Sequence, residues 1–392
     1  MSAPRIGPLA FHAVTLATFL GAAAAPTPLY RLYGESFGLS PVAVTAVFAI
    51  YAGALLAALL VAGSVSDHLG RRPVIFGALL LEIAAMALFL RAEGSGHLLA
   101  ARLVQGAATG IATASIGAAL VDADRARGPL VNATAPLLGM GVGALGTSAL
   151  VQYGPAPLHL VYGFLLVAFA LQAVAIWITP ETGGTRPGWV RSLLPRVAVP
   201  PAARRRLLLI TPVNVSTWAL GGFYLSVVPA LVVSATGSRL PLVGGSVVAA
   251  LMLSGAAAVL LRRGRPPEDN LAVGVPTLIA GIAIVLAGVH GGSVPVLGLG
   301  TLVSGVGFGA NFLGSVGSLM PLAAPDERAG LLSAFYVQSY LAFSLPAVGA
   351  GYLTGAVGYE RTADLYGAAI IACCILALAA LRAERRGKGA PP

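Results

Sequence analysis

The sequence has little charge and almost no cysteine for its 392 residues. Asp, Glu, Lys and Arg make up only 10% of the chain, whereas soluble domains carry about 25%. This scarcity excludes an ordinary soluble enzyme. The two cysteines, Cys373 and Cys374, are adjacent within an apolar run, so we expect neither a disulfide framework nor a zinc site.

Motifs for catalysis and for nucleotide binding are also missing. The five histidines are scattered, no HExxH pair occurs, and the sequence contains no P-loop of the form GxxxxGK followed by Ser or Thr. We therefore expect a protein that is not an enzyme, that needs no cofactor or metal, and that does not pump at the expense of ATP by itself.

Long apolar runs dominate what is present. Hydrophobic residues make up 57% of the chain and the mean hydropathy is +0.87. About 20 apolar residues suffice to cross a bilayer as a helix. The runs predict an all-α membrane protein with 12 transmembrane helices, at residues 11–30, 42–66, 73–92, 97–120, 129–153, 157–178, 207–233, 240–261, 270–290, 293–320, 330–355 and 363–382.

The longest polar stretch, residues 179–206, divides these runs into six and six. It contains five prolines and the basic cluster Arg204, Arg205 and Arg206, which is typical of a linker. We therefore predict an N-terminal six-helix bundle over residues 1–178, a cytoplasmic linker over 179–206, and a C-terminal bundle over 207–392 that ends in a short basic tail.

The basic residues lie mostly on one side of the predicted spans. Of the 24 Lys and Arg, 19 fall on the side of the N-terminus, four on the other side, and Arg102 within a span. Since cytoplasmic loops carry the excess of positive charge, both termini are predicted to be cytoplasmic, in a plasma or inner membrane. The net charge of +10 thus needs no nucleic-acid partner.

An alternative interpretation makes the first run a cleaved signal peptide, because Ala22 to Ala25 offer small residues for cleavage. Cleavage would leave eleven spans and break the alternation of charge.

The two halves resemble each other in sequence. Leu103-Val104-Gln105-Gly106 with Gly110 aligns with Leu302-Val303-Ser304-Gly305 and Gly309 at an offset of 199, while Gly21 and Pro28 match Gly222 and Pro229 at an offset of 201. An internal repeat is typical of transporters whose two halves rock around a site near the membrane midplane.

The loop between the second and third spans reads Gly63-Ser64-Val65-Ser66-Asp67-His68-Leu69-Gly70-Arg71-Arg72. It resembles the signature Gly-x-x-x-Asp-x-x-Gly-Arg-Arg of the major facilitator superfamily, and Arg102-x-x-Gln105-Gly106 on span four is similar to that family's second signature. The resemblance implies the major facilitator fold, two six-helix halves, and secondary transport of a small molecule by alternating access.

By this resemblance the loop acts as a conformational latch, in which Asp67 and Arg71 make charge contacts between helices. Gly63 and Gly70 permit close packing and a turn. Arg72 either belongs to the latch or only sets the topology.

Span four carries a polar stripe. Arg102, Gln105, Thr109 and Thr113 follow one another at helical spacing and share one face. A charged residue within a span usually faces a cavity, so these residues are predicted to bind substrate. Alternatively, Arg102 extends to the membrane surface.

The second half offers further candidates for the cavity. Ser304, Phe308, Asn311 and Ser315 repeat the stripe on span ten, and the resemblance implies that spans four and ten line the cavity. Aromatic and polar residues on spans seven and eleven suit an amphipathic, largely uncharged substrate; helix packing or interfacial anchoring would explain them equally well. These residues are Asn214, Trp218, Tyr336 and Tyr340.

Three further features bear on coupling. Glu82 is the only acid deep within a predicted span, and it serves either as a proton carrier or as a structural hydrogen-bonding group. Gly139 and Gly143 form a close-packing pattern that partly resembles the exporters' antiporter signature, with Ala144 in the place of its proline. Pro26 and Pro28 weaken the outer end of span one and free backbone carbonyls there.

The chain also resembles the bacterial 12-helix drug and metabolite exporters of this superfamily. With the partial antiporter signature and the sparsely charged cavity, this resemblance implies proton-coupled efflux of a small amphipathic drug or metabolite by a monomer in the lipid bilayer. The alternative is uptake of a neutral solute, such as a sugar or nucleoside, by symport or facilitated diffusion.

Overall fold

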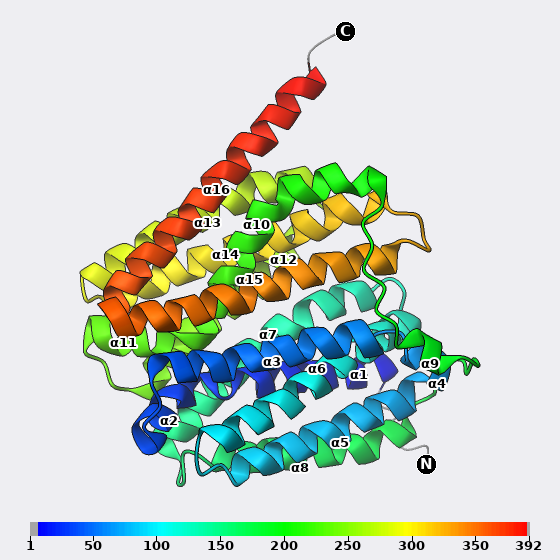
Figure 1. Ribbon diagram of the computed structural model, residues 1–392, viewed down its shortest axis with the longest axis horizontal. Helices are drawn as coiled ribbons and strands as arrows, with labels where there is room; N and C mark the ends of the chain where they lie inside the picture. The colour runs from blue at the N-terminus through cyan, green and yellow to red at the C-terminus, as the bar shows by residue number, and fades with distance from the viewer. Residues whose placement is uncertain (1–6, 390–392) are drawn as a thin grey trace. The chain divides into compact units, whose positions relative to one another are not determined.

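The computed structural model describes residues 7–389, with side chains described over residues 7–384. Helices are the only regular secondary structure in this part of the chain, which contains no strand apart from an isolated bridge between Leu69 and Thr185. Twelve of its helical segments are long and apolar enough to cross a membrane, which confirms the predicted fold class. The helices are drawn in Figure 1.

Spans one and seven are interrupted near one end. Span one consists of α1 (Pro8–Ala24), the 3-10 turn η1 (Thr27–Leu29) and α2 (Tyr30–Phe37), and span seven consists of α10 (Pro201–Ser226) and α11 (Val228–Thr236). Both breaks lie beside prolines that match in the internal repeat, and proline cannot donate the backbone hydrogen bond that would continue a helix.

The other spans are single helices. In the first half they are α3 (Pro41–Ala62), α5 (Arg71–Leu90), α6 (Ser95–Ala123), α7 (Gly128–Tyr153) and α8 (Leu160–Ala175), which η2 (Ile176–Ile178) extends. In the second half they are α12 (Pro241–Arg262), α13 (Pro267–His290), α14 (Val294–Leu319), which η3 (Met320–Leu322) extends, α15 (Arg328–Val357) and α16 (Tyr359–Gly389). Two short helices, α4 (Ser66–Leu69) and α9 (Trp189–Ser192), lie outside the spans.

The chain divides into two compact units. Unit 1 comprises Met1–Pro195 with Leu240–Ala249, and unit 2 comprises Arg196–Arg239 with Ala250–Pro392. The linker predicted over residues 179–206 ends earlier in the structure, because α10 begins at Pro201 and already contains Arg204, Arg205 and Arg206. Proline is favoured in the first turn of a helix, where its missing N–H has no acceptor to lose.

Glycines bring equivalent helices together in the two units. In unit 1, a Cβ at Gly106 or Gly110 of α6 would collide with the backbone of α3. In unit 2, Gly305 and Gly309 of α14 lie in the same way against α12. The sequence repeat therefore corresponds to a repeated packing of two helices on glycine.

Helices α13 and α14 form the tightest contact, along two glycine rows with a spacing of seven residues. Gly274, Gly281 and Gly288 of α13 lie against α14, and Gly300, Gly307 and Gly314 of α14 lie against α13. At each of these positions a Cβ would come within 3 Å of atoms of the other helix. We call this contact the glycine seam.

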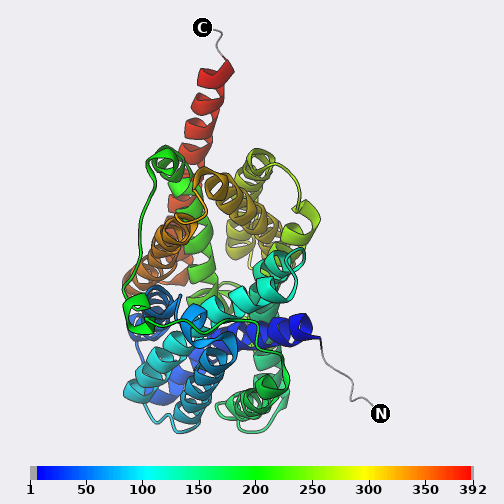
Figure 2. The same cartoon turned by 90° about the vertical axis from the view of Figure 1, so that its right-hand side faces the viewer.

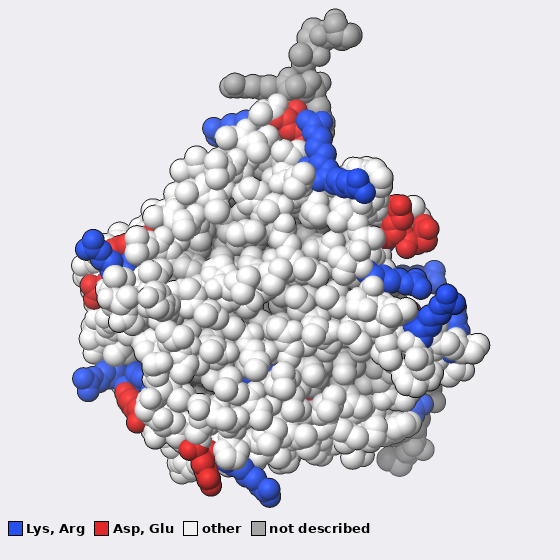
Figure 3. All heavy atoms as spheres, in the orientation of Figure 1, with Lys and Arg blue, Asp and Glu red and all other residues white. Residues whose placement is uncertain are grey.

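Exposed charged side chains lie near the ends of the helices or between them, whereas Glu82 and Arg102 are buried within α5 and α6. On the face drawn in Figure 3 most of the exposed Lys, Arg, Asp and Glu side chains lie near the edges of the view. The last part of α16 extends past the helices of unit 2 on which it packs, as Figure 2 shows. Such a distribution matches a chain whose helix centres lie in hydrocarbon and whose helix ends lie in water.

Candidate functional site

Arg102 lies in the interior of unit 1 and does not reach the surface. Its side chain is 1% exposed, donates to the carbonyl oxygen of Ala23 (3.1 Å) and to Gln105 Oε1 (2.7 Å), and lies over the ring of Tyr51 at 4.1 Å. Among the described side chains, no carboxylate lies within ion-pair distance of Arg102. The alternative that Arg102 extends to the membrane surface is therefore wrong in this structure.

Gln105 connects Arg102 to Glu82. Its Oε1 accepts from Arg102, while its Nε2 donates to Glu82 Oε1 (3.1 Å) and to the carbonyl oxygen of Ala22 (3.0 Å). In the flipped orientation of this amide, its NH₂ group would face the guanidinium of Arg102 and its oxygen would face the carboxyl group of Glu82. Only the observed orientation pairs donors with acceptors on both sides. We call Arg102, Gln105 and Glu82, with the carbonyls of Ala22 and Ala23, the Arg102 network.

The break in span one supplies an acceptor to this network. In a regular helix the carbonyl of Ala22 would accept from the residue four positions later, which is Pro26 and has no N–H. The carbonyl accepts from Gln105 Nε2 (3.0 Å), in addition to a longer bond from the N–H of Ala25 (3.3 Å). Because Pro26 lacks an N–H, the Ala22 carbonyl remains available as a hydrogen-bond acceptor for a side chain inside the apolar bundle.

The remaining members of the polar stripe are satisfied within their own helix. Thr109 Oγ1 donates to the carbonyl of Gln105 (2.9 Å), and Thr113 Oγ1 donates to the carbonyl of Thr109 (2.7 Å). Such bonds between a hydroxyl and the preceding turn are common in helices and occupy the only proton of the hydroxyl. Thr109 and Thr113 therefore contribute less to the network than their spacing predicts.

Unit 2 makes the equivalent helix contact without charge. The offset of 199 that relates Gln105 to Ser304 also relates Glu82 to Gly281. A Cβ at Gly281 would collide with Ser304, so glycine and serine pack directly where unit 1 holds a carboxyl group and an amide. The fold does not require an acid at this contact, and Glu82 is an addition that only unit 1 carries.

The prediction that Ser304 and Asn311 line an open cavity is not supported by their positions. Both are fully buried, and Cβ atoms at Gly281 and Gly274 of α13 would collide with them. The side chains thus lie in the glycine seam. A helical stripe of polar residues shows that they share a face but does not identify the helix that this face meets.

Asn214 connects two helices of unit 2. Its Nδ2 donates to Gln338 Oε1 (2.9 Å) and to Ser339 Oγ (3.0 Å), and Gln338 in turn donates to Thr211 (2.8 Å). These bonds hold α10 against α15. The side-chain amide of Asn214, which we predicted from the sequence to line the cavity, is thus used for contacts between helices.

An aromatic cluster lies beside these bonds. The ring of Trp218 is 5.2 Å from Tyr340, 6.0 Å from Phe343 and 6.4 Å from Tyr336. Trp218, Tyr336 and Tyr340 are half-buried, whereas the neighbouring Asn214 and Ser339 are buried. Of the cavity residues predicted in unit 2, these three keep a surface that a planar ligand could contact.

Helix α7 packs on α1 through Gly139 and Gly143. A Cβ at Gly139 would collide with the backbone of Ala17, and a Cβ at Gly143 with the backbone of Gly21. The close-packing pattern that the sequence predicts here thus faces the helix that carries the Ala22 and Ala23 carbonyls.

Arg71 is the centre of the signature loop. It pairs with Asp67 of the same loop, donates to Ser66 Oγ (2.7 Å) and donates through Nε to Asp122 Oδ2 at the end of α6 (3.0 Å). Gly70 has a φ of +92°, which favours glycine, and Gly63 follows the last residue of α3. Asp122 was not among the predicted site residues. Its position at the end of the span that carries Arg102, on the side of the signature loop, could have indicated a contact with that loop.

The segment after α8 binds the signature loop. Arg186 N donates to the carbonyl of His68 (2.9 Å), Ser64 Oγ donates to the carbonyl of Ser192 (3.1 Å), and Arg72 donates to the carbonyl of Trp177 (2.7 Å). Arg72 also lies 5.1 Å from the ring of Trp177. Arg72 thus has a specific partner besides its contribution to charge asymmetry.

Glu181 caps the first turn of α5. Its carboxylate accepts from the backbone N–H groups of Arg71 (2.8 Å), Arg72 (2.9 Å) and Gly183 (2.8 Å). Partial burial raises the pKa of Glu181, but these hydrogen bonds outweigh it and leave the pKa below its usual value. No motif or spacing in the predicted linker distinguishes Glu181 from its neighbours.

We expect Glu181→Gln to loosen the first turn of α5. Because the folded-state pKa is lowered, the carboxylate stabilises the fold above the ordinary pKa of about 4.3 and the effect is lost as the pH falls through the folded-state value. At pH 7 the variant should exchange the amide hydrogens of Arg71 and Arg72 about five to ten times faster, measured by hydrogen–deuterium exchange. Glu35→Gln, in an exposed pair with Arg31, is the control; equal exchange in wild type and Glu181→Gln would show that the cap contributes nothing.

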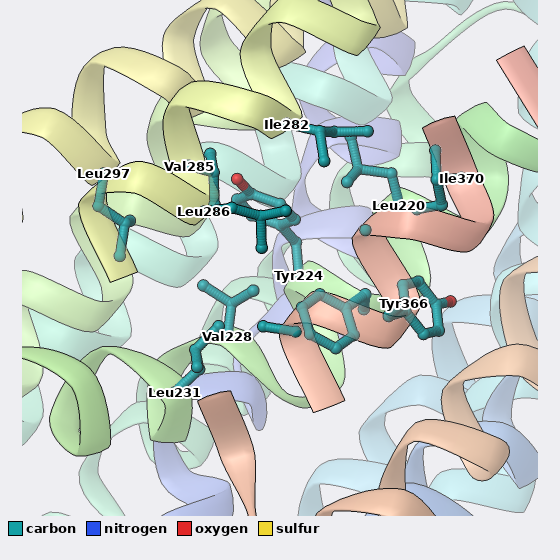
Figure 4. Close-up of a pocket in the computed structure, with 13 residues that line it drawn as sticks. Leu220, Tyr224, Val228, Leu231, Ile282, Val285, Leu286, Leu297, Tyr366 and Ile370 are labelled. Atoms are coloured by element: carbon teal, nitrogen blue, oxygen red, sulfur yellow. The ribbon is translucent and has the colours of Figure 1, made fainter. Parts of the chain in front are cut away.

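An enclosed apolar void in unit 2 is too small for a substrate. It lies among α10, α11, α13, α14 and α16 and has a volume of about 30 Å³, room for about one water molecule. Figure 4 shows Leu220, Tyr224, Ile282 and Tyr366 around it. Groups of His, Cys, Asp and Glu that could hold a metal ion do not occur within the described residues.

The protein has twelve spans, two halves related by an internal repeat, and a buried charged network. These features define a multi-pass membrane transport protein rather than an enzyme. The family model described as Major Facilitator Superfamily matches residues 11–345. The chain therefore belongs to the major facilitator superfamily, as its signature loop predicts.

Individual relatives share this architecture. The multidrug resistance protein MdtL of Klebsiella pneumoniae (strain 342) is 27% identical in an alignment 365 residues long that covers 88% of this chain and 88% of its own. The human organic anion transporter MFSD10 superimposes with a TM-score of 0.66 at 20% identity over 96% of this chain and 100% of its own. The nucleoside transporter NupG superimposes with a TM-score of 0.75 at 11% identity over 95% of this chain and 99% of its own.

Proposed function

We propose that this protein exports a small amphipathic compound across the plasma or inner membrane in exchange for protons, by alternating access. It acts as a monomer with both termini in the cytoplasm, and Glu82 is the group that binds the proton. The observation that carries this proposal is the hydrogen-bonded link from Glu82 through Gln105 to Arg102 in the interior of unit 1.

Protonation of Glu82 changes the charge of the Arg102 network. With Glu82 ionised, the guanidinium and the carboxylate balance each other across the amide of Gln105. With Glu82 protonated, the network holds one uncompensated positive charge in a dry interior, which is costly. The protonated state therefore favours a conformation in which water reaches the network, and the ionised state favours its closure. This difference is the linkage that proton-driven transport requires.

The absence of an equivalent acid in unit 2 supports a specific role for Glu82. Gly281 and Ser304 make the corresponding contact without charge, so packing alone does not explain the acid. The 27% identity to a protein named for multidrug resistance favours export. The half-buried Trp218, Tyr336 and Tyr340 support an aromatic or amphipathic substrate.

The test is proton movement in liposomes that hold the purified protein and an internal pH dye. Lipophilic drugs, neutral sugars and nucleosides are added outside in turn, and labelled compound is measured in parallel. We expect a drug to enter as protons leave, relative to protein-free liposomes. Entry of a sugar or nucleoside together with protons, or without a pH change, would instead establish uptake of a neutral solute and overturn the proposed export.

A further inference from the structure

A groove opens on unit 2 between the first turns of α13 and the C-terminal part of α16. It encloses about 370 Å³. One wall consists of Leu271, Ala272 and Pro276 of α13, and the other of Leu378 and Leu381 of α16. The walls of the groove are thus apolar side chains of two spans.

Charged residues close one end of this groove. Arg206 of α10 is largely buried and pairs with Glu384 of α16 (2.9 Å) and Glu268 of α13 (3.2 Å), so that three helices meet at one guanidinium. Arg382 lies exposed beside this cluster and pairs with no side chain in the described part of the chain. The groove therefore has apolar walls and an available cation at its charged end.

The groove lies at the depth where a bilayer changes from hydrocarbon to head groups. Glu268 and Asp269 occupy the first turn of α13, and the apolar run of α16 is followed by Arg382 and Glu384. Charged residues at helix ends mark this boundary in membrane proteins. By the predicted orientation, the groove faces the cytoplasmic leaflet.

The chemistry of the groove matches a phospholipid. A phospholipid carries an anionic phosphate directly above apolar chains, in the same order as Arg382 and the leucines. Arg206 is paired with Glu268 and Glu384, so Arg382 is the cation of the lining that is left for an anionic ligand. Basic clusters next to a span attract anionic lipids by about 1 kcal/mol for each Lys or Arg.

We propose that this groove is a binding site for one anionic phospholipid. Its phosphate pairs with Arg382, and one acyl chain lies between the α13 wall (Leu271, Ala272 and Pro276) and the α16 wall (Leu378 and Leu381). The site is separate from the Arg102 network, which belongs to unit 1. The proposal therefore does not depend on the transported substrate or on proton coupling.

The experiment is native mass spectrometry of the full-length protein in detergent, titrated with phosphatidylglycerol. Arg382→Ala should weaken binding of the first lipid about fivefold, the effect of one basic residue near a membrane surface. Ala272→Trp fills the groove from an exposed position and should weaken binding by at least as much. Arg361→Ala, an exposed arginine near the opposite end of α16, is the control and should bind as wild type does.

Three results would overturn the proposal. Unchanged binding in both variants would show that the lipid does not occupy the groove. Weaker binding in Arg382→Ala but not in Ala272→Trp would show that the lipid is attracted by surface charge and does not enter the groove. Equal binding of phosphatidylcholine would remove the preference for an anion. If Ala272→Trp fails to fold, Ala272→Leu tests the same wall with a smaller side chain.

Discussion

Glu82→Gln should abolish proton-driven transport and leave the protein folded. Glutamine can keep the hydrogen bond with Gln105 but cannot bind or release a proton at neutral pH. The ratio of substrate accumulation with and without a pH gradient should fall by about 5 to 150-fold, the range of typical coupling free energies. Flux of labelled substrate in liposomes, with and without an imposed gradient, measures this ratio.

The matched control is Glu93→Gln, which removes an exposed acid just beyond the end of α5. It should transport as wild type does. Arg102→Lys extends the test, because lysine keeps the charge but lacks the planar guanidinium, whose Nη1 donates to Ala23 and Gln105 while its Nε donates to the carbonyl of Val47. A Glu82→Gln variant that keeps its full response to the pH gradient would leave Glu82 with a structural role only.

Gly300→Ala should destabilise unit 2 strongly for a change of one methyl group. Its Cβ would collide with the backbone nitrogen of Val285 and lie 2.9 Å from the carbonyl oxygen of Gly281, so α13 and α14 must move apart. Overpacking of this kind costs about 1–3 kcal/mol. We therefore expect the thermal midpoint of the purified protein to fall by several degrees.

The chain provides its own probe and control for this measurement. Cys374 in α16 is fully buried and Cys373 is half-buried, so in a Cys373→Ser background a dye that reacts with thiols reports the unfolding of unit 2. Gly298, two residues before Gly300 on the same helix, has no atom within 4 Å of an added Cβ, so Gly298→Ala should unfold as wild type does or slightly later. Equal midpoints for the two variants would show that the glycine seam does not limit stability.

The number of helices was predictable because the bilayer leaves few alternatives. A chain in hydrocarbon must satisfy its backbone internally, so each long apolar run becomes a helix. The ends of the helices were less predictable. Span one extends to Phe37 and α10 begins at Pro201, because a helix continues into polar sequence until proline or a glycine turn ends it.

The site was predictable along one helix and not between helices. The spacing of Arg102 and Gln105 predicts a shared face, and the two residues are hydrogen-bonded in the structure. The contact between Gln105 and Glu82 depends on the register of α5 against α6, which the packing of many side chains determines. The same holds for Ser304. The helical spacing of its polar stripe is correct, but the stripe packs against the glycines of α13 and does not face a cavity.

The break in span one and the buried charge form a single mechanical unit. The carbonyl groups that hold Gln105 and Arg102 belong to the last turns of α1, directly before Pro26. Any bending of the helix at that proline displaces these carbonyls and changes the lengths of both hydrogen bonds. The angle of span one at Pro26 and the geometry of the Arg102 network are therefore coupled through the carbonyls of Ala22 and Ala23.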